Sequence, residues 1–163
     1  DWPEAMARLF AAKGRDEGKP VAFFAENIEA VRASGIFVNA VAERLAAAFW
    51  PGPLTMVLQH PAGGWDGFRV PDHPVALAWV RELGLLPAVT SANRSGEPAA
   101  LTAQEAWAAL APHVALALDG GPAGQGQAST VVKVLENEIV LLREGPIRRE
   151  DLAAAAGCAV RDK

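Results

Sequence analysis

Apolar residues recur every three or four positions along several stretches of the chain, the spacing that places them on one face of an α-helix. The stretch 38–49 is typical, because Val41, Leu45 and Phe49 follow one another at intervals of four. Pro51-Gly52-Pro53 then ends the pattern, as prolines and glycines end helices. By the same reasoning, we predict helices over about 1–13, 38–49, 74–83, 102–110 and 149–156.

Between these stretches, short apolar runs bounded by glycine, proline or charged residues predict strands. The runs are Val21–Phe24, Leu54–Leu58, Phe68–Val70, Leu86–Thr90, Val114–Leu118, Ser129–Leu135 and Ile139–Arg143. The last two predict a hairpin that turns at Glu136-Asn137, whereas His60–Gly67 is typical of a glycine-rich loop. Helices alternate with strands until this hairpin, so we predict an α/β fold with a twisted, mixed (parallel and antiparallel) open sheet flanked by helices. No repeat or linker interrupts the pattern, and residues 1–163 are expected to form a single domain.

Composition narrows the class of protein. Of the 163 residues, 51% are apolar and 21% are charged, the balance of a globular chain. The net charge of −4 argues against a global attraction to nucleic acid, so RNA contact would need a local basic patch. The single cysteine, Cys158, cannot form an internal disulfide, and no apolar run approaches the roughly 20 residues of a membrane helix. We therefore expect a cytoplasmic protein without a membrane contact.

Three cations lie close together just after the first predicted helix. Lys13 and Arg15 flank Gly14, and Lys19 follows within the same short segment. On a loop, such cations can hold a polyphosphate, arginine as a two-pronged donor and lysine as a point charge. Alternatively, Lys13 complements the helix dipole while Arg15 and Lys19 remain solvated.

Hydroxyl and amide side chains follow the strand predicted to end at Thr90. Open α/β sheets place their ligands at the carboxyl ends of strands, where Ser91 and Asn93 could orient a phosphate or a carboxylate. The alternative is an ordinary turn before Gly96, of the kind that serine and asparagine favour.

Three further polar residues occupy strand ends. Arg69, inside a short strand-like run, either reaches solvent or holds a carboxylate. Ser129 enters one strand of the predicted hairpin, and Arg143 closes the other, so both could face the same strand-end cleft.

Other common site types find little support in the sequence. His60, His73 and His113 lie on separate loops with no supporting acidic or cysteine cluster, so we predict no protein-ligand metal site. The chain has neither a G-x-S-x-G elbow nor a Walker A motif, and nothing indicates a Ser-His-Asp triad.

Several short motifs occur in a particular order along nearly the whole chain. They are Ala12-Lys13-Gly14-Arg15, Phe49-Trp50-Pro51-Gly52-Pro53-Leu54-Thr55, Phe68-Arg69-Val70-Pro71-Asp72-His73-Pro74, Thr90-Ser91-Ala92-Asn93-Arg94-Ser95-Gly96, Ala128-Ser129-Thr130-Val131-Val132 and Leu142-Arg143-Glu144-Gly145. This ordered set resembles the YrdC-like family of threonylcarbamoyl-AMP synthases. The resemblance implies an α/β sheet around a deep, positively lined cavity.

The same resemblance implies a reaction in which L-threonine, bicarbonate and ATP give threonylcarbamoyl-AMP and pyrophosphate. A tRNA-modifying threonylcarbamoyl transferase complex would then use the product, and Mg²⁺ would accompany ATP. The resemblance also implies roles for individual residues. ATP binding falls to Lys13, Arg15, Lys19, Ser91, Asn93 and Arg143, with Lys13 and Arg15 catalytic, and threonine binding falls to Arg69, Thr90 and Ser129.

The chain departs from the family pattern at three places. Members begin with a strand and a P-T-(D/E)-T-x-Y-G-L segment, whereas this chain opens on Asp1, so we expect part of the threonine site to be absent from it. Phe24 stands where many members carry a histidine, and Asp16 replaces a common proline.

Two other functions stay open on the sequence alone. One is a double-stranded RNA-binding module without catalysis, using a local patch that includes Lys13 and Arg69. The other is a carbamoyl-transfer domain of the hydrogenase-maturation type, although its zinc-finger and acylphosphatase neighbours are not in this sequence.

Overall fold

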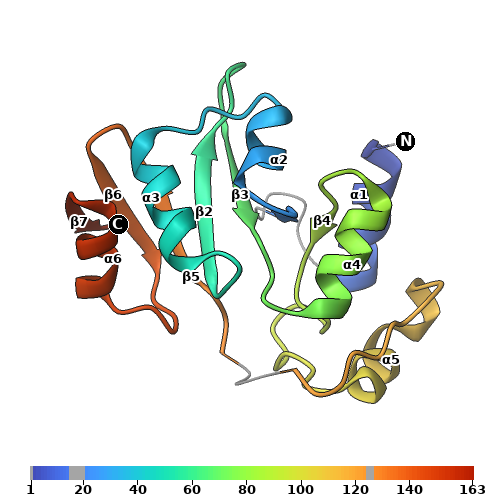
Figure 1. The fold of residues 1–163 in the computed structure, drawn as a ribbon. Coiled ribbons are helices and arrows are strands. Elements are labelled where there is room, and N and C mark those ends of the chain that lie inside the picture. The colour runs from blue at the N-terminus through green and yellow to red at the C-terminus, as the bar shows by residue number, and fades with distance from the viewer. Residues whose placement is uncertain (1, 15–20, 124–126) are drawn as a thin grey trace. The chain divides into compact units, whose positions relative to one another are not determined.

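A computed structural model of the chain describes residues 2–14, 21–123 and 127–163 (Figure 1). The chain divides into two compact units, which are described separately below. Unit 1 comprises Asp1–Pro20 and Thr90–Gly126, and unit 2 comprises Val21–Val89 and Gln127–Lys163. The single domain expected over 1–163 stays a prediction.

A seven-stranded sheet forms the centre of unit 2, in the order β4-β1-β3-β2-β5-β6-β7. The strands are β1 (Ala22–Phe24), β2 (Leu54–Gln59), β3 (Trp65–Arg69), β4 (Ala88–Val89), β5 (Thr130–Val134), β6 (Glu138–Arg143) and β7 (Ala159–Asp162). Pairs β1/β3, β2/β5 and β6/β7 are parallel, and the other neighbouring pairs are antiparallel. The predicted mixed open sheet is therefore confirmed, including the hairpin of β5 and β6.

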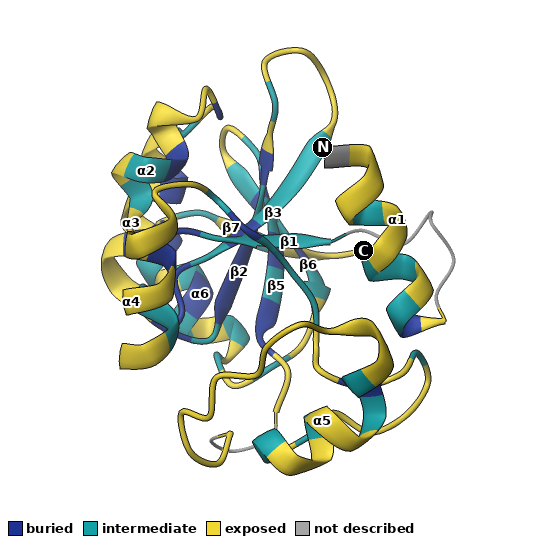
Figure 2. Cartoon of the chain, turned by 90° about the vertical axis from the view of Figure 1, so that its right-hand side faces the viewer, coloured by how far each residue is buried: buried dark blue, intermediate teal, exposed yellow. Residues whose placement is uncertain are grey.

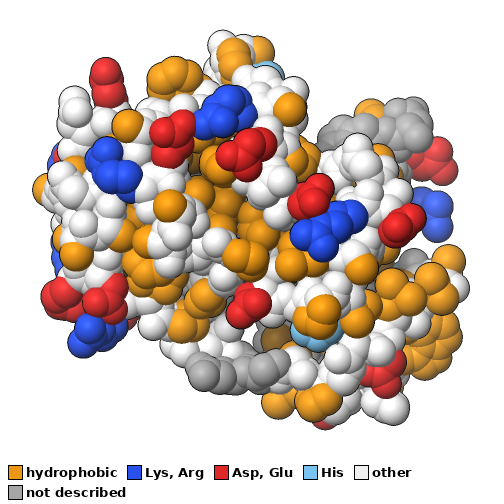
Figure 3. Space-filling model, in the orientation of Figure 1, with side chains coloured by type: hydrophobic (Ala, Val, Ile, Leu, Met, Phe, Trp, Pro, Cys, Tyr) orange, Lys and Arg blue, Asp and Glu red, His pale blue; other side chains and the backbone are white. Residues whose placement is uncertain are grey.

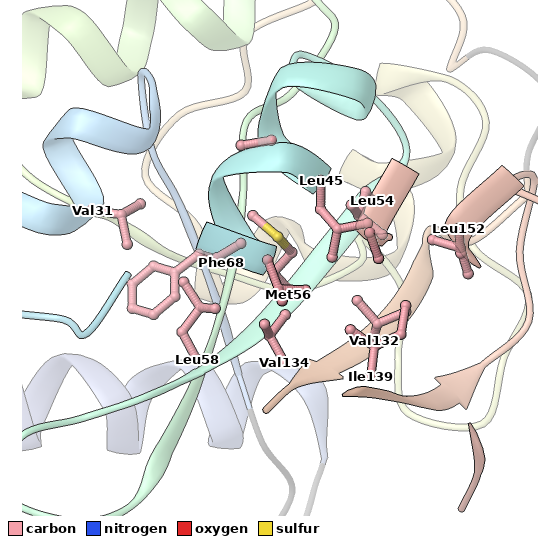
Figure 4. Packing of buried hydrophobic residues seen from close by; sticks show 14 of the residues in the cluster. Val31, Leu45, Leu54, Met56, Leu58, Phe68, Val132, Val134, Ile139 and Leu152 are labelled. Atoms are coloured by element: carbon pink, nitrogen blue, oxygen red, sulfur yellow. The ribbon is translucent and has the colours of Figure 1, made fainter. Parts of the chain in front are cut away.

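The helices of unit 2 cover one face of this sheet. They are α2 (Ile28–Ala33), α3 (Ala40–Phe49), α4 (Pro74–Leu83) and α6 (Arg149–Ala156). Figures 1 and 2 show α2, α3 and α4 on the same side of the strands. The core lies beneath them, and Figure 4 shows Leu45 of α3 and Leu152 of α6 packing with Leu54, Met56 and Val132 of the strands. All five side chains are completely buried.

Unit 1 contains α1 (Trp2–Lys13), α5 (Ala103–Leu110) and a short 3₁₀ helix, η1 (Ala111–His113). The predicted cap of α5 is present, because Thr102 Oγ1 accepts a hydrogen bond of 3.2 Å from the backbone nitrogen of Glu105. The Glu105 carboxylate reaches back one residue further than a capping box requires and accepts from the backbone nitrogen of Leu101 at 2.7 Å.

Two of the strand and loop predictions were wrong. Residues 114–118 form no strand, and Leu116 is 73% exposed, because an apolar run becomes a strand only where it finds a pairing partner. Residues 65–67, predicted as loop, belong to β3, because pairing with β2 holds even Asp66 and Gly67 in the sheet. In addition, α2 and β7 were not predicted, and the run at 86–90 forms only the two-residue β4.

Among the residues described, no helix has the length and apolar character needed to span a membrane.

Candidate functional site

Lys13 ends α1 and is buried against the loop that carries Ser91 and Asn93. Lys13 is only 4% exposed. Its ammonium donates to the backbone oxygen of Ser91 at 2.6 Å and to Oδ1 of Asn93 at 2.9 Å. The backbone oxygen of Asn93 accepts a further short hydrogen bond, and Ser91 Oγ lies 3.4 Å from the ammonium. Because an ammonium carries three donors, Lys13 fastens this loop to the end of the helix.

Asn93 completes the connection from the loop side. It is 9% exposed, and its amide nitrogen donates to the backbone oxygens of Glu97 at 2.7 Å and Arg94 at 3.1 Å. The backbone nitrogen of Ser95 donates to the backbone oxygen of Lys13 at 2.9 Å. The structure thus brings Lys13 together with Ser91 and Asn93 in a more closely bonded loop than an ordinary turn would need.

Three other residues of unit 1 were predicted to bind substrates: Arg15, Lys19 and Thr90. Arg15 and Lys19 lie outside the described residues. Thr90, predicted to contact threonine, directly precedes Ser91 and is partly exposed.

In unit 2, side chains along β2 point alternately to the two faces of the sheet. One face packs into the core, and the other carries a second set of polar side chains. Leu54 and Met56 point into the core, so Thr55 between them points to the opposite face of the sheet. Met56 pairs with Phe68 across the antiparallel strands, which places Thr55 beside Arg69 at the end of β3.

The register continues across the next two strands. Thr55 pairs with Val131 of β5, and Val131 pairs with Arg143 of β6. Ser129 precedes Val131 by two residues and therefore lies on the same face. We call Arg69, Thr55, Ser129 and Arg143 the polar row.

Hydrogen bonds join three members of the polar row. Arg143 donates through Nε to the backbone oxygen of Ser129 at 3.0 Å and through Nη2 to Ser129 Oγ at 3.0 Å. Thr55 Oγ1 lies 2.8 Å from Ser129 Oγ, and either hydroxyl can be the donor. Ser129 and Thr55 are 5% and 7% exposed, so both hydroxyls depend largely on protein or ligand partners.

Arg69 adds a second guanidinium to the polar row. Its Nε donates to the backbone oxygen of Gly52 at 2.9 Å, which holds the side chain against the turn before β2. Burial lowers the pKa of Arg69 below its ordinary value, the positive charge of Arg143 lowers it further, and Asp72 partly offsets both effects. Two cations that repel each other in a partly buried place favour a bound anion, so the polar row can hold a carboxylate or a phosphate.

Two glycines of the sequence motifs are required by close packing next to the polar row. A Cβ on Gly145 would lie 2.3 Å from the backbone nitrogen of Thr130, and a Cβ on Gly52 would lie 2.4 Å from the backbone oxygen of Phe49. Thr130 in turn accepts a hydrogen bond of 3.0 Å from the backbone nitrogen of Ile147. The segment around 145–147 thereby supports the start of β5, where Ser129 lies.

The sequence did not single out Thr55 as a site residue. It sits inside an apolar strand, and only the period-two alternation of that strand could have indicated that it faces away from the core. The sequence also missed Lys133 of β5, whose ammonium lies 3.8 Å from the centre of the Trp65 ring in a cation–π contact. Phe24, where the family resemblance implies a histidine, pairs with Arg69 in the register of β1 and β3.

Neither a metal cluster nor a convergence of histidines is found in the described part of the chain. No group of three or more histidine, cysteine, aspartate or glutamate side chains there could hold a metal ion. That the protein has no metal site built from its own side chains stays a prediction.

A separate surface pocket of about 480 Å³ lies on the helix-covered side of unit 2. Ile28, Ala46, Trp50 and Val70 give it an apolar lining, and Glu29 is among its charged residues. Figure 3 views this side and shows hydrophobic side chains reaching the surface between the helices. No member of the polar row lines the pocket.

Comparison with known proteins gives consistent matches. The family model Sua5/YciO/YrdC, described as "Telomere recombination", matches residues 1–145. A Mycobacterium tuberculosis protein is 37% identical over 162 residues, which are 94% of this chain and 74% of that protein. The threonylcarbamoyl-AMP synthase of Bacillus subtilis is 35% identical over 170 residues, covering 98% of this chain and 49% of its own length.

The fold also matches solved structures. The crystal structure of Pyrococcus abyssi Sua5 complexed with L-threonine is 30% identical and superposes with a TM-score of 0.87. That match covers 98% of this chain and 49% of the Pyrococcus chain. The chain therefore spans about half the length of the Bacillus and Pyrococcus relatives and about three quarters of the mycobacterial one.

Proposed function

Because the chain belongs to the Sua5/YciO/YrdC family, we propose that it catalyses the synthesis of threonylcarbamoyl-AMP from L-threonine, bicarbonate and ATP, with release of pyrophosphate. The observation that carries the proposal is the match over almost the whole chain to relatives of that name. The cations of the polar row and the buried ammonium of Lys13 support the proposal, because all the substrates carry negative charge.

The proposal assigns threonine to the polar row. Arg69 pairs with the threonine carboxylate, and the hydroxyl of Ser129 contacts the same substrate, with Thr90 as a further contact. Two features support this assignment. Burial keeps the Arg69 guanidinium poorly solvated, and the nearby charge of Arg143 makes the loss of solvation more costly until an anion arrives. The Pyrococcus relative, moreover, was crystallised with L-threonine.

ATP binding is assigned to the loop at 91–93 and to the cations at and after the end of α1. Lys13 shapes the loop and adds a buried positive charge, the amide of Asn93 holds the loop from inside, and the exposed Ser91 presents its hydroxyl. The family resemblance further implies ATP binding by Arg15, Lys19 and Arg143. This distribution suits a triphosphate, which needs several donors and cations at once.

The reaction requires mainly that the reactants are correctly positioned and that their negative charges are stabilised. The threonine nitrogen first takes up carbon from bicarbonate, with loss of water, to give an N-carboxylate. An oxygen of this carboxylate attacks the α-phosphorus of ATP, and the bond from that phosphorus to the bridging oxygen breaks as pyrophosphate leaves. Both reactants are anionic, so the cationic residues Lys13 and Arg15 lower the barrier by stabilising the charge that moves onto the leaving group.

Mg²⁺ would bind together with ATP in this scheme. In the described residues no cluster of acidic side chains could hold the ion, so the phosphates and water would carry it. The product would pass to a tRNA-modifying threonylcarbamoyl transferase complex, in the cytoplasm.

Release of pyrophosphate tests the proposed function. The purified protein should release it only when threonine, bicarbonate and ATP are all present. Serine or valine in place of threonine measures the selectivity of the amino-acid site. Release that does not depend on threonine would refute the proposal.

A further inference from the structure

We propose that Thr55 is a positioning residue for the amino-acid substrate: it donates its hydroxyl proton to Ser129 and so leaves the Ser129 proton for the substrate. The inference rests on the proposed function, because it assumes that Ser129 meets threonine. It concerns a residue inside β2 that forms part of no predicted site.

The first step concerns the lone pairs of Ser129. A serine hydroxyl carries one proton and two lone pairs. The guanidinium of Arg143 can only donate, so its 3.0 Å contact with Ser129 Oγ occupies one lone pair. What remains on Ser129 is one lone pair and one proton, and Thr55 engages one of these two at 2.8 Å.

The second step decides which of the two Thr55 engages. If Ser129 donated to Thr55, the Thr55 proton would need another acceptor. Thr55 is 7% exposed, and within the described chain Ser129 is the only hydrogen-bond partner of its hydroxyl. A buried hydroxyl proton without an acceptor costs free energy. If Thr55 donates, the proton without a protein acceptor is that of Ser129, and an acceptor oxygen of the bound substrate then satisfies it.

The third step follows for Ser129. With Arg143 and Thr55 both donating to its oxygen, Ser129 has no lone pair left and acts only as a donor. Next to the positively charged Arg69 and Arg143, the ligand is an anion with acceptor oxygens, such as an amino-acid carboxylate. Thr55 thus sets Ser129 in the orientation that an acceptor oxygen of the substrate needs, without contacting the substrate itself.

A double-mutant cycle tests this role. Thr55→Val keeps the shape of the side chain and removes the donor, and Thr55→Ser keeps the donor. Calorimetry should show threonine affinity roughly 3- to 10-fold weaker in Thr55→Val, the range that one hydrogen bond supplies, and restored in Thr55→Ser. ATP affinity and the melting temperature should stay close to those of the wild type. In steady-state assays, KM for threonine should rise more than kcat falls.

The decisive comparison uses a Ser129→Ala background. If Thr55 acts through Ser129, adding Thr55→Val to Ser129→Ala should weaken threonine binding no further. Additive losses would overturn the inference, as would full threonine affinity in Thr55→Val. Should Thr55→Val fail to fold, Thr55→Ala serves in the same cycle. Absence of threonine binding in the wild type would overturn the proposed function and this inference together, whereas normal wild-type binding with additive losses would overturn only the role of Thr55.

Discussion

Replacing Asn93 with alanine tests whether the loop at 91–97 is a built site or an ordinary turn. The substitution removes an acceptor from the buried ammonium of Lys13 and two donors, those to the backbone oxygens of Arg94 and Glu97. A hydrogen bond to a charged group contributes about 1.5–3 kcal/mol and a neutral one about 1 kcal/mol. We therefore expect Asn93→Ala to lower the free energy of unfolding by roughly 3–5 kcal/mol.

Urea unfolding followed by circular dichroism measures this loss, and hydrogen exchange locates it. Exchange should accelerate in the segments 8–14 and 91–97, because the side chain of Asn93 joins them. ATP affinity should fall as well, since the loop loses its shape. Asn137→Ala is the matched control, because Asn137 is exposed in the turn between β5 and β6. A loss below about 0.5 kcal/mol, equal to a typical surface substitution, would show that the contacts of Asn93 do not organise the loop.

Three further predictions concern the core, the start of β5 and the cysteine. Leu45→Ala, at a completely buried side chain, should cost about 2–5 kcal/mol in urea unfolding, and a cost under 1 kcal/mol would mean that α3 packs loosely on the sheet. Gly145→Ala should weaken both folding and threonine binding, because its Cβ would meet the backbone of Thr130; a variant with wild-type melting temperature and affinity would contradict this. Burial raises the pKa of the Cys158 thiol, so at a given pH less thiolate is present and iodoacetamide should react more slowly than with the urea-unfolded chain. Equal rates in the two states would contradict that expectation.

The sequence predicted best those elements whose ends carry local signals. α4 begins at Pro74 and ends before Gly84, which adopts the left-handed conformation that glycine allows. α6 likewise ends at Gly157. These signals act within a few residues, so they can be read without knowing the rest of the fold.

Strands were harder to predict because their partners are distant in the sequence. The run 114–118 has an apolar composition but stays exposed, whereas Trp65–Gly67, with a charge and a glycine, becomes a strand by pairing with β2. The two-residue β4 exists through its pairing with β1. Composition within a window does not report such pairing.

The candidate site was predicted in part for the same reason. Lys13, Ser91 and Asn93 stood out by residue type, and the structure brings them together. Thr55 belongs to the polar row only through the register of β2 with β3 and β5, which cannot be read from the sequence. The deep cavity that the family resemblance implies, and the roles of Arg15 and Lys19, stay predictions.

The central claim concerns the product, so its identity is the most direct test. The purified protein would be incubated with ATP, Mg²⁺, L-threonine and ¹³C-labelled bicarbonate, and the nucleotides would be analysed by mass spectrometry. We expect an AMP adduct of threonine that carries one labelled carbon and disappears when any one of ATP, threonine or bicarbonate is omitted. A threonine–AMP adduct without the labelled carbon, or no adduct beside intact ATP, would contradict the claim that this chain makes threonylcarbamoyl-AMP.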